Sequence, residues 1–93
     1  MEIFRDDDGK KGRFRILIDG NEAGLMTYTW AGEGKFIIDH TEVYPDFSGQ
    51  GVGKELVMAG VAFAQENDLK IIPLCTYAKR VFDRTPDIKD LLF

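Results

Sequence analysis

The sequence contains one cysteine, Cys75, and one histidine, His40. A single cysteine cannot form an intramolecular disulfide, and with one histidine it cannot supply the four side chains of a structural zinc site. The acidic run at residues 6–8 lacks the further ligands of a calcium loop, so we interpret it as part of a solvated turn. We therefore expect neither a disulfide nor a metal, and a chain of 93 residues that depends on one hydrophobic core.

Long apolar segments are also missing. No run approaches the roughly 20 apolar residues that a membrane-spanning helix needs. Residues 1–8 lack the basic and apolar regions of a signal peptide. These two absences lead us to expect a cytoplasmic protein that has no membrane partner.

Basic charge is scarce. The chain has 12 Lys and Arg residues against 16 Asp and Glu residues, which gives a net charge of −4. A nucleic-acid-binding surface usually needs a clustered basic face, so we expect no nucleic-acid partner. An apolar fraction of 44 % and a charged fraction of 30 % are instead typical of an ordinary globular protein. The length allows one domain, which we expect to span residues 1–93.

The first half of the chain has the pattern of an antiparallel sheet. Segments rich in β-branched and aromatic residues lie between glycine-containing turns, which predicts strands over residues 2–5, 13–18, 22–30 and 35–43. Residues 6–12 are predicted to form a polar loop. Because alternate residues of a strand face the same way, one side of the last strand is predicted to carry Phe36, Ile38, His40 and Glu42.

The second half of the chain changes period. Apolar residues recur at spacings of three and four from Val52 to Phe63, which predicts a helix of about four turns. A short apolar strand over residues 69–74 is predicted to follow, then a helix over residues 77–84 and a short helix that starts at Thr85 and Pro86. Pro73 cannot donate a hydrogen bond, so we expect strand pairing to fail near the end of residues 69–74.

A strand, a helix and a strand in this order form a right-handed crossover between parallel strands. The predicted fold is therefore of the α/β class with a mixed sheet. It consists of an antiparallel strand meander, a long helix, a parallel strand and short C-terminal helices.

Three glycines, Gly49, Gly51 and Gly53, stand at alternate positions where the long helix begins. A loop without side chains lets a ligand approach its backbone closely, and a helix N-terminus adds free N–H groups and the positive end of the helix dipole. This arrangement favours an anion, most often a phosphate. A tight turn that binds nothing is the alternative.

His40 and Cys75 lie at the carboxyl ends of the two predicted parallel strands. Ligands of open sheets bind at that edge. The sequence does not fix the side on which either residue lies, so contact between them is a hypothesis. Taken alone, each residue also fits a structural role: a lone cysteine is often a small buried hydrophobe.

Two known phosphate motifs do not fit the glycine loop. A P-loop would need Gly in place of Ser48 and Ser or Thr in place of Glu55, and a dinucleotide-binding loop would need a third glycine. The loop instead resembles the acetyl-coenzyme A signature of the GNAT superfamily of N-acetyltransferases, which reads Gln or Arg, two residues, Gly, one residue, Gly or Ala. Gly51 and Gly53 fill the two small positions, and Ser48 stands where Gln or Arg is usual. The order of elements resembles the superfamily over residues 13–83.

The resemblance implies both a cofactor and a set of residues that bind it. The sequence is similar to a minimal branch of the superfamily, in which a histidine on the fourth strand and a cysteine after the fifth are proposed catalytic groups; His40 and Cys75 occupy these positions. By resemblance, backbone groups near Val43 hold the pantetheine of acetyl-coenzyme A, and those of the glycine loop hold its pyrophosphate. The residues expected to bind coenzyme A are Glu42, Val43, Ser48, Gly49, Gln50, Gly51, Val52, Gly53, Lys54 and Tyr77. Lys79 and Arg80 lie near the expected cleft but fit an ordinary helix surface equally well.

The expected function is transfer of an acetyl group from acetyl-coenzyme A to an amine. An amine could attack the thioester directly, or Cys75 could first accept the acetyl group, and we favour the second route. His40 could accept a proton from the amine or from the Cys75 thiol, because an imidazole accepts protons near neutral pH. Cys75 stands just before a predicted helix, whose dipole favours the thiolate. The helices that usually build the acceptor site are missing, so the amine acceptor could be a small molecule or a protein. The alternatives are a non-catalytic module that binds coenzyme A or a partner protein, and a purely structural domain.

Overall fold

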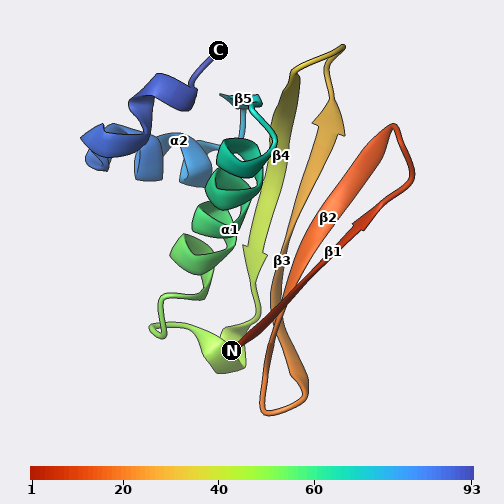
Figure 1. Cartoon of the computed structure of the whole chain (residues 1–93). Coiled ribbons are helices and arrows are strands. Elements are labelled where there is room, and N and C mark those ends of the chain that lie inside the picture. Colours follow the sequence, from red (N-terminus) through yellow and green to blue (C-terminus); the bar gives the residue numbers. More distant parts are fainter.

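The computed structural model describes residues 1–93 as a five-stranded mixed sheet with helices packed against one face (Figure 1). The elements, in chain order, are β1 (Glu2–Asp7), β2 (Lys11–Ile18), β3 (Asn21–Trp30), β4 (Lys35–Val43), the 3-10 helix η1 (Pro45–Phe47), α1 (Val52–Glu66), β5 (Lys70–Pro73), α2 (Thr76–Arg84) and the 3-10 helix η2 (Pro86–Leu91). The strands lie in sequence order; β1 to β4 are antiparallel, and β5 runs parallel to β4. The predicted fold class is confirmed. None of the helices is long and apolar enough to cross a membrane.

The first hairpin is longer than predicted. Residues 6–12 do not form a loop, because Asp6 pairs with Arg13 and Asp7 pairs with Gly12, which leaves only residues 8–10 to turn the chain. The acidic residues are accommodated in the strand by opposite charges across the ladder: Asp6 Oδ2 lies 3.3 Å from Nε of both Arg13 and Arg15. Such cross-strand pairs offset the low strand propensity of aspartate.

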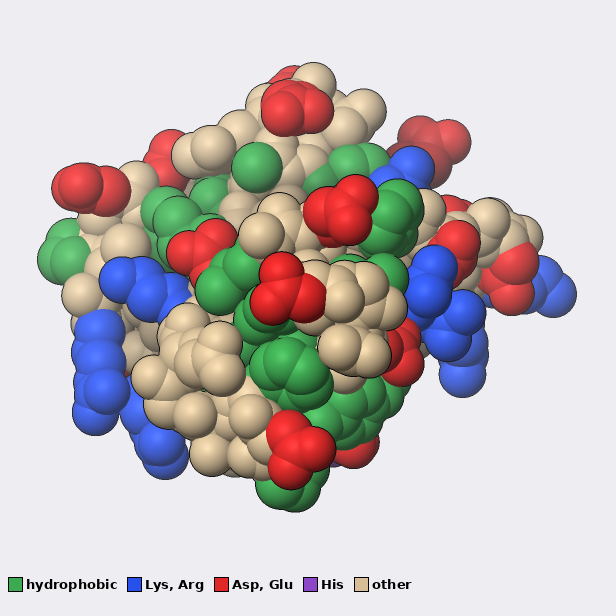
Figure 2. Space-filling view, turned by 90° about the horizontal axis from the view of Figure 1, so that it is seen from below, with side chains coloured by type: hydrophobic (Ala, Val, Ile, Leu, Met, Phe, Trp, Pro, Cys, Tyr) green, Lys and Arg blue, Asp and Glu red, His purple; other side chains and the backbone are tan.

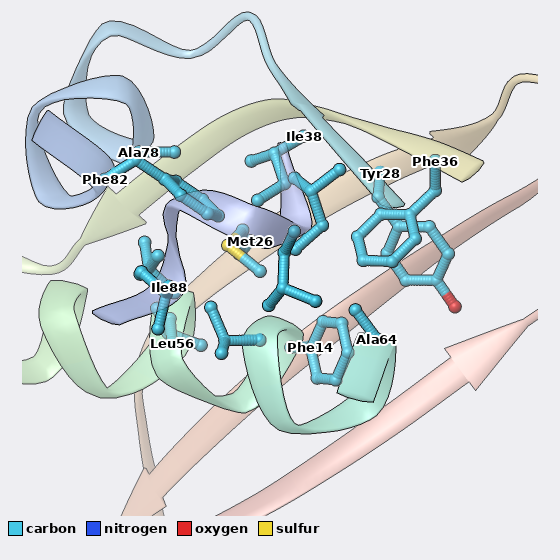
Figure 3. Close-up of a cluster of buried hydrophobic side chains, with 14 of the residues drawn as sticks. Phe14, Met26, Tyr28, Phe36, Ile38, Leu56, Ala64, Ala78, Phe82 and Ile88 are labelled. Atoms are coloured by element: carbon cyan, nitrogen blue, oxygen red, sulfur yellow. The ribbon is translucent and has the colours of Figure 1, made fainter. Parts of the chain in front are cut away.

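The core lies between the inner face of the sheet and α1 (Figure 3). Its fully buried side chains come from β2, β3, β4 and α1, among them Ile16, Met26, Tyr28, Phe36, Ile38, Leu56 and Val57. Each such apolar side chain contributes about 1.5–3 kcal/mol relative to an exposed one. Ala78 and Phe82 from α2 join the same cluster, so α1 and α2 lie side by side on this face.

One irregularity in the sheet decides which side chains reach the core side. The pairing of β3 with β4 shifts between Thr27 and Tyr28: Tyr28 lies opposite Ile38, whereas Thr27 lies opposite His40. Asp39 therefore has no partner, which is a β-bulge. A bulge reverses the alternation of every residue beyond it.

The second half of β4 consequently faces the opposite way from the prediction. Thr41 lies opposite the fully buried Met26 and therefore points to the inner face, while its neighbours His40 and Glu42 are exposed on the outer face. The prediction that His40 and Glu42 share a side with Phe36 and Ile38 is wrong, because it assumes an unbroken two-residue period.

The parallel pair of strands separates near Pro73, as predicted. The ladder between β4 and β5 runs from Lys35 opposite Lys70 to Ile38 opposite Pro73 and then ends. The backbone N–H of Cys75 donates to the carbonyl of Ile38 at 3.1 Å, and the chain then turns into α2. Residues 39–43 of β4 therefore have no strand neighbour on the β5 side; we call this segment the free edge of β4.

Candidate functional site

The glycine loop leads from the lower end of β4 in Figure 1, through η1, into α1. Gly49 and Gly51 have φ angles of +81° and +76°, in the left-handed region that favours glycine, and nothing lies within 4 Å of a Cβ built on either residue. Gly51 is the N-cap of α1 and offers no side chain to satisfy the first N–H groups of the helix. The loop is therefore open to a ligand at a helix N-terminus, where anions are stabilised.

Gly53 differs from Gly49 and Gly51 in its surroundings. A Cβ on Gly53 would lie 2.7 Å from both Cζ and Oη of Tyr77, so the space beside this glycine is filled by the phenol ring. The absence of a side chain at Gly53 thus permits close contact between α1 and α2. The same contact brings Tyr77 of α2 beside the N-terminus of α1, in the region where it was expected.

A pocket lined by cations adjoins this helix end. Its volume is about 250 Å³, and it is lined by Lys54, Tyr77, Arg80, Val81, Arg84 and Thr85. None of the three cations lies within 4.0 Å of a carboxylate, since the ion pairs of the structure all involve other residues. In Figure 2 one group of Lys and Arg side chains gathers on the side of the molecule where α2 lies. We call Lys54, Arg80 and Arg84 the basic pocket.

Of these three cations, Lys54 is among the residues expected to bind coenzyme A and Arg80 is expected near the cleft, whereas Arg84 is not among the predicted residues. The signal was present: residues four apart lie on the same side of a helix, so Arg80 and Arg84 belong together on α2. Lys79, which was considered equally with Arg80, does not line the pocket.

Cys75 lies where β4 and β5 separate. It is the N-cap of α2 and is half-buried; its Sγ donates a hydrogen bond to Oγ1 of Thr41 over 3.6 Å. Burial raises the pKa of the thiol, but hydrogen bonds that stabilise the thiolate outweigh it: they come from the backbone N–H of Ala78, from the Thr41 hydroxyl group once it turns to donate, and from the backbone N–H groups of Tyr77 and Thr41. The net effect holds the pKa of Cys75 below its ordinary value, which favours the nucleophilic thiolate.

His40 is not beside Cys75. The imidazole side chain is 61 % exposed, and its Nε2 lies 3.4 Å from Oε1 of Glu42. Because Thr41, the next residue, points to the inner face and contacts Cys75, His40 points to the outer face. The structure therefore does not bring together His40 and Cys75, the two residues that are predicted to be catalytic.

Other residues that are predicted to bind coenzyme A lie on the free edge of β4 and in the glycine loop. Val43 lies on the inner side of the free edge, Glu42 lies on its outer side, and Ser48 and Gln50 are exposed in the loop. The free edge carries backbone groups that an extended ligand can pair with, as an added strand does. It leads from Cys75 toward the N-terminus of α1.

The largest hollow of the molecule lies elsewhere. It measures about 610 Å³ over the outer side of β1, β2 and β3, and its lining includes none of the residues nominated above. Its carboxylates already have partners: Asp6 pairs with Arg13 and Arg15, and Asp39 accepts a hydrogen bond from the Thr29 hydroxyl group at 2.7 Å. We therefore assign the candidate site to the free edge of β4, the glycine loop and the basic pocket.

Known proteins share this arrangement of elements. Residues 13–91 match the family described as GCN5-related N-acetyl-transferase. The protein NATD1 of Xenopus tropicalis is 29 % identical over 82 residues, which cover 87 % of this chain and 75 % of that protein. A GCN5-like protein of Staphylococcus aureus, solved by NMR, is 35 % identical with a TM-score of 0.73, over 99 % of this chain and 87 % of that one. The ribosomal-protein-alanine N-acetyltransferase of Brucella melitensis biovar Abortus 2308 shares the fold with a TM-score of 0.72 at 20 % identity, over 83 % of this chain and 62 % of that enzyme.

Proposed function

Because the chain belongs to the GCN5-related N-acetyltransferase family, we propose that it transfers an acetyl group from acetyl-coenzyme A to an amine acceptor. The observation that carries the proposal is the free edge of β4, which has the Cys75 thiol beside it and leads toward the open N-terminus of α1. Acyl transfer from acetyl-coenzyme A needs three features: a groove that binds the extended pantetheine, an anion site that binds the phosphate groups, and a reactive group beside the thioester.

The residues present fit coenzyme A in both charge and shape. The first N–H groups of α1 and the cations of the basic pocket are unpaired, and they suit the phosphate groups of coenzyme A. The free edge, through Glu42 and Val43, suits the amide groups of pantetheine, since residues 39–43 lack a strand neighbour. Open space around Gly49 and Gly51 leaves room for a ligand against the loop backbone.

Acetyl-coenzyme A supplies the acetyl group in activated form, as a thioester. In the proposed route the Cys75 thiolate forms a bond to the acetyl carbon, the bond to the coenzyme A sulfur breaks, and that sulfur takes a proton from water. The amine acceptor then forms a bond to the same carbon, Cys75 leaves as a thiolate, and His40 takes the proton from the amine. Because His40 is on the outer face, it takes this proton only from an amine that approaches the acetyl carbon from the outer face, through the gap between β4 and β5.

Intact-protein mass spectrometry and calorimetry with acetyl-coenzyme A test this proposal. We expect micromolar binding by the natural chain and by Cys75→Ala, and a gain of one acetyl group by the natural chain alone. Addition of amines, from polyamines to peptide N-termini, should then discharge the acetyl group. Absence of binding overturns the proposal; turnover without acetyl-Cys75 keeps the activity and replaces the covalent route by direct attack of the amine.

A second candidate function is a non-catalytic module that binds coenzyme A. It is favoured by one observation: α1 and α2 both lie on the inner face, so no helix builds an acceptor pocket on the outer face. Binding without turnover for any amine of the panel would support this module over the enzyme.

A further inference from the structure

Thr41, and not His40, lies beside Cys75 on the inner side of β4. We propose that Thr41 is the positioning residue of Cys75: its hydroxyl group orients the sulfur at the mouth of the gap between β4 and β5 and stabilises the thiolate. The catalytic use of this contact rests on the proposed function. The effect of Thr41 on the Cys75 thiol can be tested without acetyl-coenzyme A.

The backbone holds both partners of this contact. The β-bulge at Asp39 turns Thr41 to the inner face, opposite the fully buried Met26. Cys75 is fixed by its N–H bond to the Ile38 carbonyl at 3.1 Å and by its own carbonyl, which accepts from the N–H of Lys79 at 3.0 Å. The sulfur and the hydroxyl oxygen are therefore brought to 3.6 Å by the sheet and by α2, not by a chance rotamer of an exposed side chain.

The hydroxyl group can serve both protonation states of the sulfur. Toward the thiol, Oγ1 of Thr41 accepts the S–H bond, as the structure shows. Toward the thiolate, the same hydroxyl group can turn and donate its O–H, because a hydroxyl group is both donor and acceptor. Cys75 is the only side chain to which Thr41 makes a hydrogen bond, so no other contact opposes this turn.

No charged group competes for this role. From β4, His40 and Glu42 lie on the outer face and pair with each other. From α2 and α1, the side chains of Tyr77, Lys79, Arg80 and Lys54 make no hydrogen bond or ion pair with the thiol. The only titratable residue of β5, Lys70, is at the opposite end of that strand and donates to the Asp90 carbonyl. The stabilising groups around the sulfur are thus neutral donors: the Thr41 hydroxyl group and the backbone N–H groups of Thr41, Tyr77 and Ala78.

The pH dependence of alkylation measures the contact directly. Cys75 is the only cysteine, so the rate of reaction with iodoacetamide reports this thiol alone. Thr41→Val removes the hydroxyl group at nearly constant shape, Thr41→Ser keeps it, and His40→Asn changes the adjacent residue on the other face. The midpoint of the pH profile is the quantity to compare, because a thiolate of higher pKa is also intrinsically more nucleophilic and the rate alone would mislead.

We expect Thr41→Val to raise the midpoint by about one pH unit, because the variant removes a hydrogen bond that stabilises the charged form of the thiol. Thr41→Ser should restore the midpoint, and His40→Asn should leave it unchanged. An unchanged midpoint in Thr41→Val, or an equal rise in His40→Asn, overturns the proposal. If Thr41→Val does not fold, as judged by circular dichroism, Thr41→Ala supplies a second variant without the hydroxyl group.

The outcome is separable from that of the proposed function. A raised midpoint in Thr41→Val together with no acetyl gain on Cys75 would retain the positioning role and remove the covalent route. If both hold, acetyl uptake by Thr41→Val should be slowed at neutral pH and recover at higher pH, a response that a merely structural role would not give.

Discussion

Tyr77 and Gly53 are in direct contact across the α1–α2 interface: the phenol ring fills the space that a side chain on Gly53 would need, with Cζ and Oη 2.7 Å from the Cβ position. This contact fixes α2, and with it Cys75, against the helix end that is proposed to bind phosphate. It also predicts that the effect of Gly53→Ala on stability changes sign with the residue at position 77.

Gly53→Ala should lower the free energy of unfolding by about 1–3 kcal/mol, because the new methyl group overpacks the interface and must displace the ring. In a Tyr77→Ala background the clash is absent, and the same change should stabilise by up to about 1 kcal/mol, since alanine is the better helix former. Urea unfolding of the four proteins measures the coupling. A Gly53→Ala effect of the same sign in both backgrounds would contradict this reading of the contact.

Charge reversal in the basic pocket should weaken binding of acetyl-coenzyme A. Each of Lys54→Glu, Arg80→Glu and Arg84→Glu replaces an unpaired cation, and we expect a loss of about fivefold or more, the range of an exposed charge interaction of about 1 kcal/mol. Lys79→Glu is the matched control, because it makes the same change in net charge on α2 outside the pocket. Calorimetry at two salt concentrations is the measurement. Equal losses of affinity for Lys79→Glu and Arg84→Glu would show that the overall charge of the protein, and not the basic pocket, causes the weaker binding.

Replacement of His40 should separate two steps of the proposed reaction. His40 and Cys75 are on opposite faces, so His40→Asn should leave acetylation of Cys75 within about twofold. The amine-dependent step should slow by about a hundredfold, which is the usual contribution of a general base. Single-turnover mass spectrometry follows both steps. Equal slowing of both would mean that His40 acts on the thiol after all.

Asp7 should make the fold sensitive to acid. Burial raises the pKa of this carboxyl, but hydrogen bonds from the Tyr28 hydroxyl group, the Gly9 backbone N–H and the Trp30 indole, with the charge of Arg5, hold it below the ordinary value of 3.8. A depressed pKa in the folded state contributes stability above the ordinary pKa, and this contribution is lost as the pH falls through the folded pKa. Urea unfolding below pH 4 should therefore show a steeper loss for the natural chain than for Asp7→Asn. Parallel profiles for the two proteins would show that Asp7 carries no such linkage.

Much of the fold could be predicted because the strands and turns of the sheet have clear local sequence patterns. The boundaries of residues 35–43 match β4, and the helix that follows the glycines begins at Val52, since period-two and period-3.6 patterns change sharply at the glycine loop. The first hairpin was underestimated because its strands are stabilised by pairs such as Asp6 with Arg13, which become neighbours only after the hairpin forms.

The site was only partly predictable, for a geometric reason. A β-bulge adds one residue to a strand without a distinctive residue type, and Asp39 carries no such signal in the sequence. An unbroken alternation therefore predicts that His40 shares a side with Ile38, whereas in the structure Thr41 lies on that side. Arg84 was missed for a different reason: its importance depends on the packing of α2 beside α1, which brings it to the same pocket as Lys54.

The order of the strands has a consequence for how the chain reaches this structure. Every strand of the sheet lies beside the strand that precedes it in the sequence, and β1 to β4 are joined by short turns. Loops of this length cost little entropy to close, and chains whose contacts are local in sequence tend to cross their folding barrier quickly. The slowest steps should then be the non-local ones, in which α1 packs against the sheet and β5 pairs with the edge of β4. The candidate site lies where β4 and β5 separate, so we expect it to form late in folding.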